Sequence, residues 1–372
     1  MSLYLDLLRF VAAMEVFAFH ISSFPFLGIE RSAWNAYGHE AVTIFFVLSG
    51  FVIRHAAGSR DSDMSAFATS RITRVYSVAL PCLVLTLLFD TVGRTLAPDY
   101  YAGLIPDGSA LLRLAIGAAM MNEAWVSVQI LSNTPYWSIS YEVWYYAIFA
   151  ATFYCSGRSR WLLVTACSVI AGPKILLLFP IWAMGWLAYV ERGSARLPVW
   201  VSLALFMQPV AMLMLFDQFH LARAGGAFLE AQLGHDLWRN GLAWSRFVFS
   251  DTALGLSVAL HLVGAKGLGQ WLWSALSPFE TPIRFGAARS FTLYLLHQPA
   301  ILFAAALLAT APLGAWRGLI VAAASLGIII LVALVTEGQR HRFKPVAAAI
   351  VQGAAIVSKQ IFGARQPTRA ER

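Results

Sequence analysis

The sequence predicts an all-α, polytopic membrane protein, and both its composition and the length of its apolar runs indicate this fold class. Of its 372 residues, 59% are hydrophobic and only 12% are charged, whereas soluble domains carry roughly 25% charged residues. The apolar runs are about 17–23 residues long, which is enough for a helix to cross the hydrocarbon core. The alternation typical of membrane β-barrels is absent. We therefore expect a bundle of about ten transmembrane helices.

Ten apolar runs follow one another along the chain. An eleventh stretch, 110–131, is less apolar because Asn122 and Glu123 interrupt it. We expect it to be a re-entrant segment that returns to the side from which it came, with a full eleventh span as the alternative. The ten predicted spans are 3–24, 39–57, 75–93, 136–154, 161–173, 175–190, 197–216, 246–264, 290–310 and 318–337.

The basic residues favour ten spans over eleven. If the N-terminus is cytoplasmic and 110–131 is re-entrant, 18 of the 27 Lys and Arg residues lie inside and 8 outside, with Arg9 left aside. This distribution obeys the positive-inside rule, whereas an eleventh span would reverse the second half of the chain. We expect a multi-pass protein of the inner (plasma) membrane with both termini in the cytoplasm. Residues 1–344 would form the membrane domain and 345–372 a short basic tail.

The first predicted span, 3–24, contains Asp6, Arg9, Glu15 and His20. An ionisable group at membrane depth costs several kcal/mol unless it is paired or faces a cavity, so these residues suggest a functional site. Arg9 and His20 lie about 20° from the same helix face and roughly 16 Å apart along the axis. Because an imidazole exchanges its proton near neutral pH, the pattern indicates anion binding at Arg9 and proton transfer at His20.

The second span contains Ser49 and Gly50 within an apolar run. Small residues in a membrane helix allow another backbone to approach closely. Helix packing and a role as a backbone donor at the site are equally compatible with this pair.

Arg71 and Arg74 stand at the start of the third span, on the predicted cytoplasmic side. Residues at i and i+3 share a helix face, and two guanidinium groups suit bidentate binding of phosphate. Ordinary positive-inside anchors would give the same pattern, and composition alone favours that interpretation.

Glu142 lies about one to two turns into an aromatic span that begins with Trp137 and Ser138 and continues with Tyr145. A lone buried carboxylate needs a partner or a proton. We expect its partner to be one of the arginines or the histidine of the earlier spans, in a site or in a structural ion pair.

Several residues suggest only structural roles at this stage. His297, shortly before Pro299, is interpreted as a hydrogen-bonded histidine at a turn of helix interrupted by proline. The cysteines Cys82, Cys155 and Cys167 have neither disulfide nor metal spacing, and we predict no metal site. The basic residues mark helix ends instead of forming one patch, so we expect no nucleic-acid partner.

The order of these motifs resembles the acyltransferase 3 family of membrane proteins, over nearly the whole chain. Pro81 follows the arginine pair slightly later than is usual in the family, and His39 and Glu40 stand where small apolar residues are usual. The motifs that carry the resemblance are Leu5-Asp6-Leu-Leu-Arg9 with His20, Phe45 to Phe51, Arg71-x-x-Arg74, Trp137-Ser138 with Glu142, and Ser290 to His297.

The resemblance implies transfer of an acyl group, usually acetyl, from cytoplasmic acyl-CoA to a sugar hydroxyl. Acceptors of the family include O-antigen, exopolysaccharide, peptidoglycan and lipid-linked or small glycosides. Acyl-CoA would be a co-substrate without a bound cofactor, and membrane lipid and the carbohydrate acceptor, possibly lipid-linked, would be the other partners.

Site roles follow from this resemblance as hypotheses. Arg9, Arg71 and Arg74 would hold the CoA phosphates, and His20 would be the general base. Glu142 would orient His20 or pair with an arginine. The residues expected to support this site are Asp6, Ser49, Gly50, Trp137, Ser138, Tyr145 and His297.

Two alternatives remain at the level of sequence. The buried charges could form the proton relay of a transporter of acyl groups, lipids or sugars, although no inverted repeat is visible. Alternatively, a member of the same family could use succinyl or longer donors, or a macrolide or small glycoside as acceptor. The sequence also does not distinguish direct transfer from an acyl-histidine intermediate.

Overall fold

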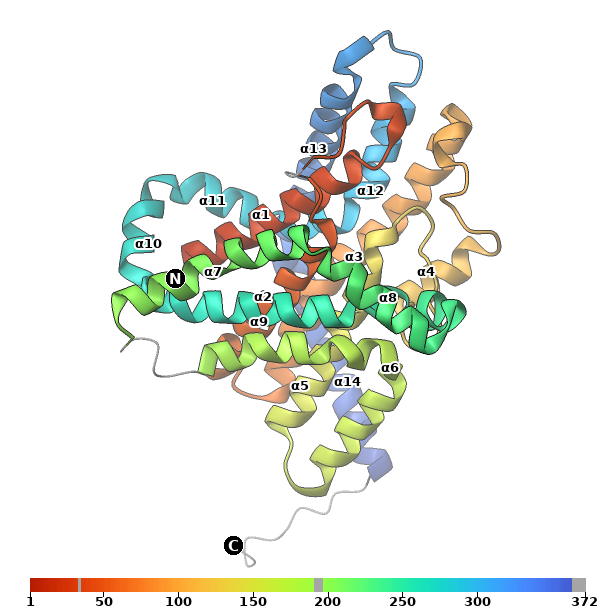
Figure 1. The fold of residues 1–372 in the computed structure, drawn as a ribbon. Coiled ribbons are helices and arrows are strands. Elements are labelled where there is room, and N and C mark those ends of the chain that lie inside the picture. The colour runs from red at the N-terminus through yellow and green to blue at the C-terminus, as the bar shows by residue number, and fades with distance from the viewer. Residues whose placement is uncertain (33–34, 191–196, 363–372) are drawn as a thin grey trace, which may run out of the picture.

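The computed structural model describes residues 1–32, 35–190 and 197–362, and these form a helical bundle without a β-strand (Figure 1). A single isolated β-bridge joins Ile130 and Asn133. The all-α prediction is confirmed. The helices are α1 (Ser2–Ile21), α2 (Gly38–Ser59), α3 (Met64–Leu96), α4 (Ala110–Ala118), α5 (Trp137–Tyr154), α6 (Gly157–Val190), α7 (Val199–Gln218), α8 (Leu221–Leu233), α9 (Val248–Gly267), α10 (Gly269–Leu276), α11 (Glu280–Ala287), α12 (Ser290–Leu307), α13 (Arg317–Val335) and α14 (Lys344–Phe362).

Within the described residues, seven helical segments are long and apolar enough to cross a membrane. They contain α2, α3, α6, α7, α9, α12 and α13. Helices α1 and α5 are not among them, although they have 20 and 18 residues, because their sequences are more polar. They are the helices that hold Arg9, His20 and Glu142. The prediction of a polytopic helical membrane protein is confirmed.

Helix α6 contains two of the predicted spans, 161–173 and 175–190. Its backbone leaves the helical conformation at Gly172, where φ is 80° and ψ is 172°. A side chain is strained at this positive φ, and a Cβ there would lie only 2.6 Å from the carbonyl oxygen of Ala124. Glycine therefore allows the chain to turn before Pro173, and the two halves of α6 run in different directions (Figure 1).

The segment 110–131 does not cross the bundle. Its helix α4 has nine residues, about 14 Å of helix against a core of about 30 Å. Tyr76 donates a hydrogen bond to the carbonyl of Ala118 (3.0 Å), and Ser132 donates one to Asp90 (2.6 Å). Tyr76 and Asp90 are about 21 Å apart along α3, so the segment descends beside α3 and returns. This path fits the re-entrant prediction and not a full eleventh span.

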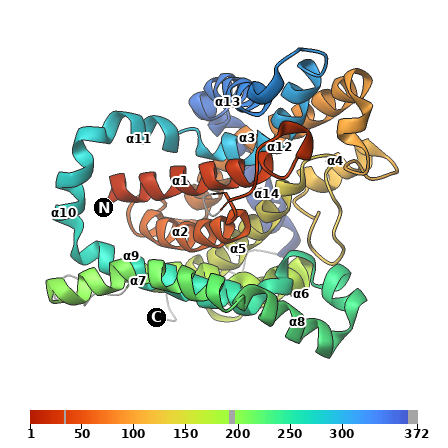
Figure 2. The same ribbon diagram turned by 45° about the horizontal axis from the view of Figure 1, so that its top comes forward.

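Helix α12 lies at the centre of the bundle and contacts α1, α3 and α13. Of its 18 residues, 83% are buried within the protein. Helix α1 packs against α2 as well as α12, and Figure 2 shows α1 beside α2 in a second view. The residues of α1, α2, α3, α5 and α12 are thereby brought around one interior region.

Gly50 lies where α2 crosses α6. A Cβ at Gly50 would overlap the carbonyl oxygen of Trp182, and one at Gly185 would overlap that of Val47. The two glycines thus let the two backbones touch. Of the two interpretations of Gly50, the structure supports helix packing, since the backbone amides within α2 are used in the helix itself.

Helix α14 packs against α3. The first two thirds of the predicted tail 345–372 therefore fold onto the membrane domain as a helix, and residues 363–372 lie outside the described residues.

Candidate active site

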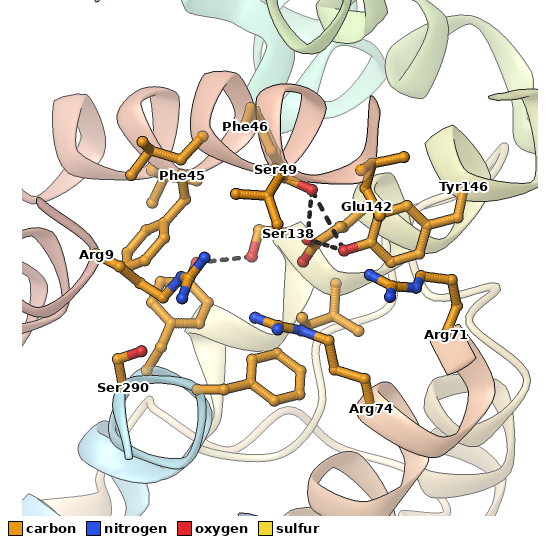
Figure 3. Close-up of a pocket in the computed structure, with 17 residues that line it drawn as sticks. Arg9, Phe45, Phe46, Ser49, Arg71, Arg74, Ser138, Glu142, Tyr146 and Ser290 are labelled. Carbon is orange, nitrogen blue, oxygen red and sulfur yellow. Dashed lines mark hydrogen bonds between the residues drawn. The ribbon is translucent and has the colours of Figure 1, made fainter. Parts of the chain in front are cut away.

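A cavity of about 60 Å³ opens between α1, α2, α3, α5 and α12. Arg9 of α1 and Arg71 and Arg74 of α3 line it, and Figure 3 shows their guanidinium groups directed toward the same space. The structure thus brings together the three arginines that were predicted to bind an anion, although α1 and α3 are separated in sequence by more than forty residues.

The charges of these arginines are only partly balanced. Arg9 Nη1 lies 3.4 Å from Asp6 Oδ1, and Arg71 Nη2 lies 3.3 Å from Asp61 Oδ2. Arg74 makes no ion pair within 4.0 Å with any described residue. The Nε of Arg71 is buried, and no described group accepts its hydrogen. The cavity therefore offers positive charge and N–H donors to a ligand.

Glu142 lines the same cavity and accepts hydrogen bonds from two hydroxyl groups. Ser49 Oγ donates to Glu142 Oε1 at 2.7 Å, and Tyr146 OH donates to the same oxygen. The indole of Trp182 in turn donates to Ser49 Oγ at 3.2 Å. Over the described ranges, Glu142 has neither a hydrogen bond to His20 nor an ion pair with an arginine. In this structure the hydrogen-bond partners of Glu142 are therefore hydroxyl groups.

Ser138 and Tyr294 place two more hydroxyl groups at the cavity wall. Their oxygen atoms are 2.7 Å apart, and Figure 3 shows Ser138 opposite Arg9. Phe45 lies edge-on to the ring of Tyr294, with the two centroids 5.3 Å apart. This aromatic contact fixes the position of the phenol, so that a carbonyl oxygen of a ligand would meet ordered hydroxyl donors.

His20 and His297 lie next to each other beyond Tyr294. Their ring centroids are 4.7 Å apart, and that of His297 is 6.1 Å from the ring of Tyr294. His297 is fully buried. Neither histidine is among the described residues that line the cavity itself. The interpretation of His297 as an ordinary structural histidine did not anticipate this contact.

Two residues predicted to support the site lie elsewhere in the core. The ring of Trp137 stacks on that of Trp244, with 5.0 Å between the centroids. On this side of the core it also lies nearly parallel to the ring of His39, at a centroid distance of 6.5 Å. Tyr145 donates its hydroxyl hydrogen to the carbonyl of Ile175 at 2.9 Å. Both side chains pack the helices around the cavity, and neither is among its described lining residues.

Tyr146 and Tyr294 are lining residues that the candidate set from the sequence omitted. A signal for each was present, because Tyr146 follows Glu142 by four residues and Tyr294 precedes His297 by three. Such spacings place both members of a pair on one helix face. Tyr146 follows the predicted residue Tyr145 directly and lies about 100° further around the helix, where it lines the cavity.

A second group of buried charges lies apart from the cavity. Lys174 Nζ is 3.6 Å from Glu123, and the side chains are 1% and 3% exposed. Ser127 joins them, since it donates to Glu123 and accepts from Lys174, both at 2.7 Å. This pair ties the re-entrant segment to the residues that follow the break in α6.

No group of three or more His, Cys, Asp or Glu side chains with the geometry for a metal ion occurs in the described part of the chain.

Comparisons with known proteins identify the family. The model of the acyltransferase 3 family, described as "Acyltransferase domain", matches residues 2–336. Acyltransferase MdmB of Streptomyces mycarofaciens is 29% identical over 153 residues, which are 38% of this chain. The match spans 36% of that relative's own length. No solved structure matches the chain.

Proposed function

We propose that this chain, which belongs to the acyltransferase 3 family, transfers an acyl group from acyl-CoA to a hydroxyl of a cell-surface or secreted carbohydrate. The preferred acyl group would be acetyl. The observation that carries this proposal is the cavity in which Arg9, Arg71 and Arg74 converge beside ordered hydroxyl groups.

The arginines suit the donor. CoA carries a diphosphate and a ribose phosphate, and guanidinium groups bind phosphate through paired hydrogen bonds. The described cavity lining contains three arginines and one carboxylate, Glu142. This excess of positive charge in a low-dielectric interior would bind the phosphates at the mouth and leave the thioester to extend toward Ser138 and Tyr294.

His20 supplies the base in this mechanism. The acceptor hydroxyl oxygen attacks the thioester carbon, a C–O bond forms, and the C–S bond breaks. The hydroxyl proton passes to His20 and then to the sulfur of the departing CoA. One hydroxyl hydrogen of the Ser138–Tyr294 pair lies between their two oxygen atoms, and the other stabilises the negative charge on the thioester oxygen.

The orientation in the membrane completes the proposal. With both termini in the cytoplasm, as the distribution of basic residues favours, Arg71 and Arg74 near the start of α3 face the cytoplasmic pool of acyl-CoA. His20 lies near the opposite end of α1, where a carbohydrate acceptor, possibly lipid-linked, would arrive from the other side of the inner membrane.

The test compares detergent-purified wild type with His20→Ala, using acetyl-CoA labelled in the acetyl group. Both proteins should bind acetyl-CoA with dissociation constants that agree within about threefold, because His20 lies outside the cavity lining. Only the wild type should release or transfer the label, since loss of a general base costs about 10²–10⁴ in rate. Absence of binding by both folded proteins would contradict the assignment of the donor.

A further inference from the structure

The contact between His20 and His297 joins two helices that are far apart in sequence. Their ring planes are inclined by 58°, with 4.7 Å between centroids. His297 is fully buried, whereas His20 is half-buried. Phe19 packs edge-on against His20 at 5.1 Å, and the guanidinium of Arg31 lies over the Phe19 ring, 4.0 Å from its centroid.

Hydrogen bonds fix the tautomer of each ring. His20 Nδ1 lies 2.9 Å from the carbonyl oxygen of Val16, and His297 Nδ1 lies 2.8 Å from that of Tyr294. A carbonyl oxygen only accepts, so each Nδ1 carries a hydrogen. In the neutral rings each Nε2 therefore carries a lone pair and is free to take up a proton.

The Nε2 atom of His297 is buried and has no hydrogen-bond partner within the described residues. Burying an acceptor without a hydrogen-bond partner is destabilising. Two lone pairs cannot hydrogen-bond to each other, so this cost is expected while both rings are neutral. The contact between the two rings brings this lone pair close to any positive charge on His20.

The usual partner of a catalytic histidine is absent here. In hydrolytic triads a buried carboxylate orients the imidazole and stabilises its protonated form. Glu142, the one carboxylate among the described lining residues, is bonded instead to Ser49 and Tyr146. Across the described ranges, neither His20 nor His297 has an acidic side chain within 4.0 Å.

We infer that His297 is the positioning partner of His20 and stabilises its protonated form in a site where no carboxylate is near. The proton of the acceptor hydroxyl enters on His20 Nε2, because Nδ1 already donates to Val16. The lone pair of the neighbouring His297 stabilises the resulting positive charge until that proton moves on to the sulfur of CoA, and both rings are then neutral. This inference rests on the proposed function and assigns the group that stabilises its charged intermediate.

Two substitutions at His297 separate this role from simple packing. His297→Gln keeps a polar side chain whose amide oxygen can accept a hydrogen bond near the position of Nε2. His297→Phe keeps a ring of similar size and removes the acceptor. If His297 only packed the core, the apolar ring would be the milder change, because a buried polar group without partners is destabilising.

The proposed role predicts the opposite order for the turnover number with acetyl-CoA. We expect kcat to fall about 100-fold in His297→Phe and about tenfold or less in His297→Gln, within the range for proton-transfer groups. The KM for acetyl-CoA should stay within about threefold of wild type in both. Gln298→Met is the matched control, because Gln298 is the next residue of α12 and is also buried, and its kcat should stay within about threefold of wild type.

The outcomes are distinguishable. Suppose that the wild type is active and that the kcat of His297→Phe equals or exceeds the kcat of His297→Gln. This result would overturn the inference and leave the proposed function intact. A rise in KM that accounts for the whole loss of activity would also overturn it. A folded wild type that neither binds nor turns over acetyl-CoA would overturn the proposed function and this inference with it.

Discussion

Two regions of this protein bury charged side chains, and they do so in different ways. In the first, Lys174 and Glu123 face each other at 3.6 Å, and Ser127 bonds to both. In the second, the arginine cavity, Arg74 has no acidic partner within 4.0 Å among the described residues, and Glu142 bonds to hydroxyl groups. The first region is complete without a ligand, whereas the second has charge in excess.

This difference separates a structural pair from a binding site. Removing a charge from water costs several kcal/mol, and this cost is offset only by a well-placed partner. Lys174 has that partner within the fold, at the point where the chain turns after Gly172. The arginines of the cavity lack sufficient partners, so an anionic ligand would supply the missing stabilisation.

The largest expected effect concerns the structural pair. Lys174→Met should leave Glu123 as a buried charge without its cation and lower the free energy of unfolding by about 3–5 kcal/mol. Thermal unfolding of the detergent-purified protein measures this change. The double variant Lys174→Met, Glu123→Met should recover most of the loss, because apolar residues replace both charges. Equal instability of the single and double variants would contradict a role as an ion pair.

An intermediate effect is expected for Arg74→Ala. A hydrogen bond to a charged group contributes about 1.5–3 kcal/mol, so the KM for acetyl-CoA should rise about 10–100-fold. The kcat should stay within about threefold of wild type, since Arg74 binds the phosphates and not the reacting atoms. Steady-state kinetics measures both constants.

The control for this prediction is Arg223→Ala, which removes an exposed arginine on α8 and should change neither constant. An Arg74→Ala variant with a normal KM and a strongly reduced kcat would place the arginine at the reaction centre and break the distinction between binding and chemistry.

The smallest effect is expected for Glu142→Gln. The amide keeps one oxygen that accepts a hydrogen bond from Ser49 or Tyr146. The substitution removes the negative charge that Glu142 contributes to the described lining of the cavity. Acetyl-CoA should bind about two- to fivefold tighter at low salt, and the gain should shrink as ionic strength rises. Binding measured at two salt concentrations tests this, with Asp236→Asn, an exposed change, as the control. Weaker binding would show that Glu142 holds the arginines in place.

The sequence by itself determined the class of the protein and the helix faces that carry polar groups. Composition and run length predict a polytopic helical bundle because the bilayer imposes a fixed span and internal hydrogen bonding on any chain that crosses it. The 3.6-residue period likewise determined that Arg71 and Arg74 share a face. The sequence order of the polar motifs was sufficient to indicate the acyltransferase 3 family.

Only the tertiary structure decided which faces meet. The partners of Glu142 are Ser49 and Tyr146 rather than His20, and the partner of His20 is His297. Such pairs depend on how each helix is rotated and where it crosses its neighbours. Contacts such as that of Gly50 with α6 set these crossings, and helical periodicity within one segment contains no information about them.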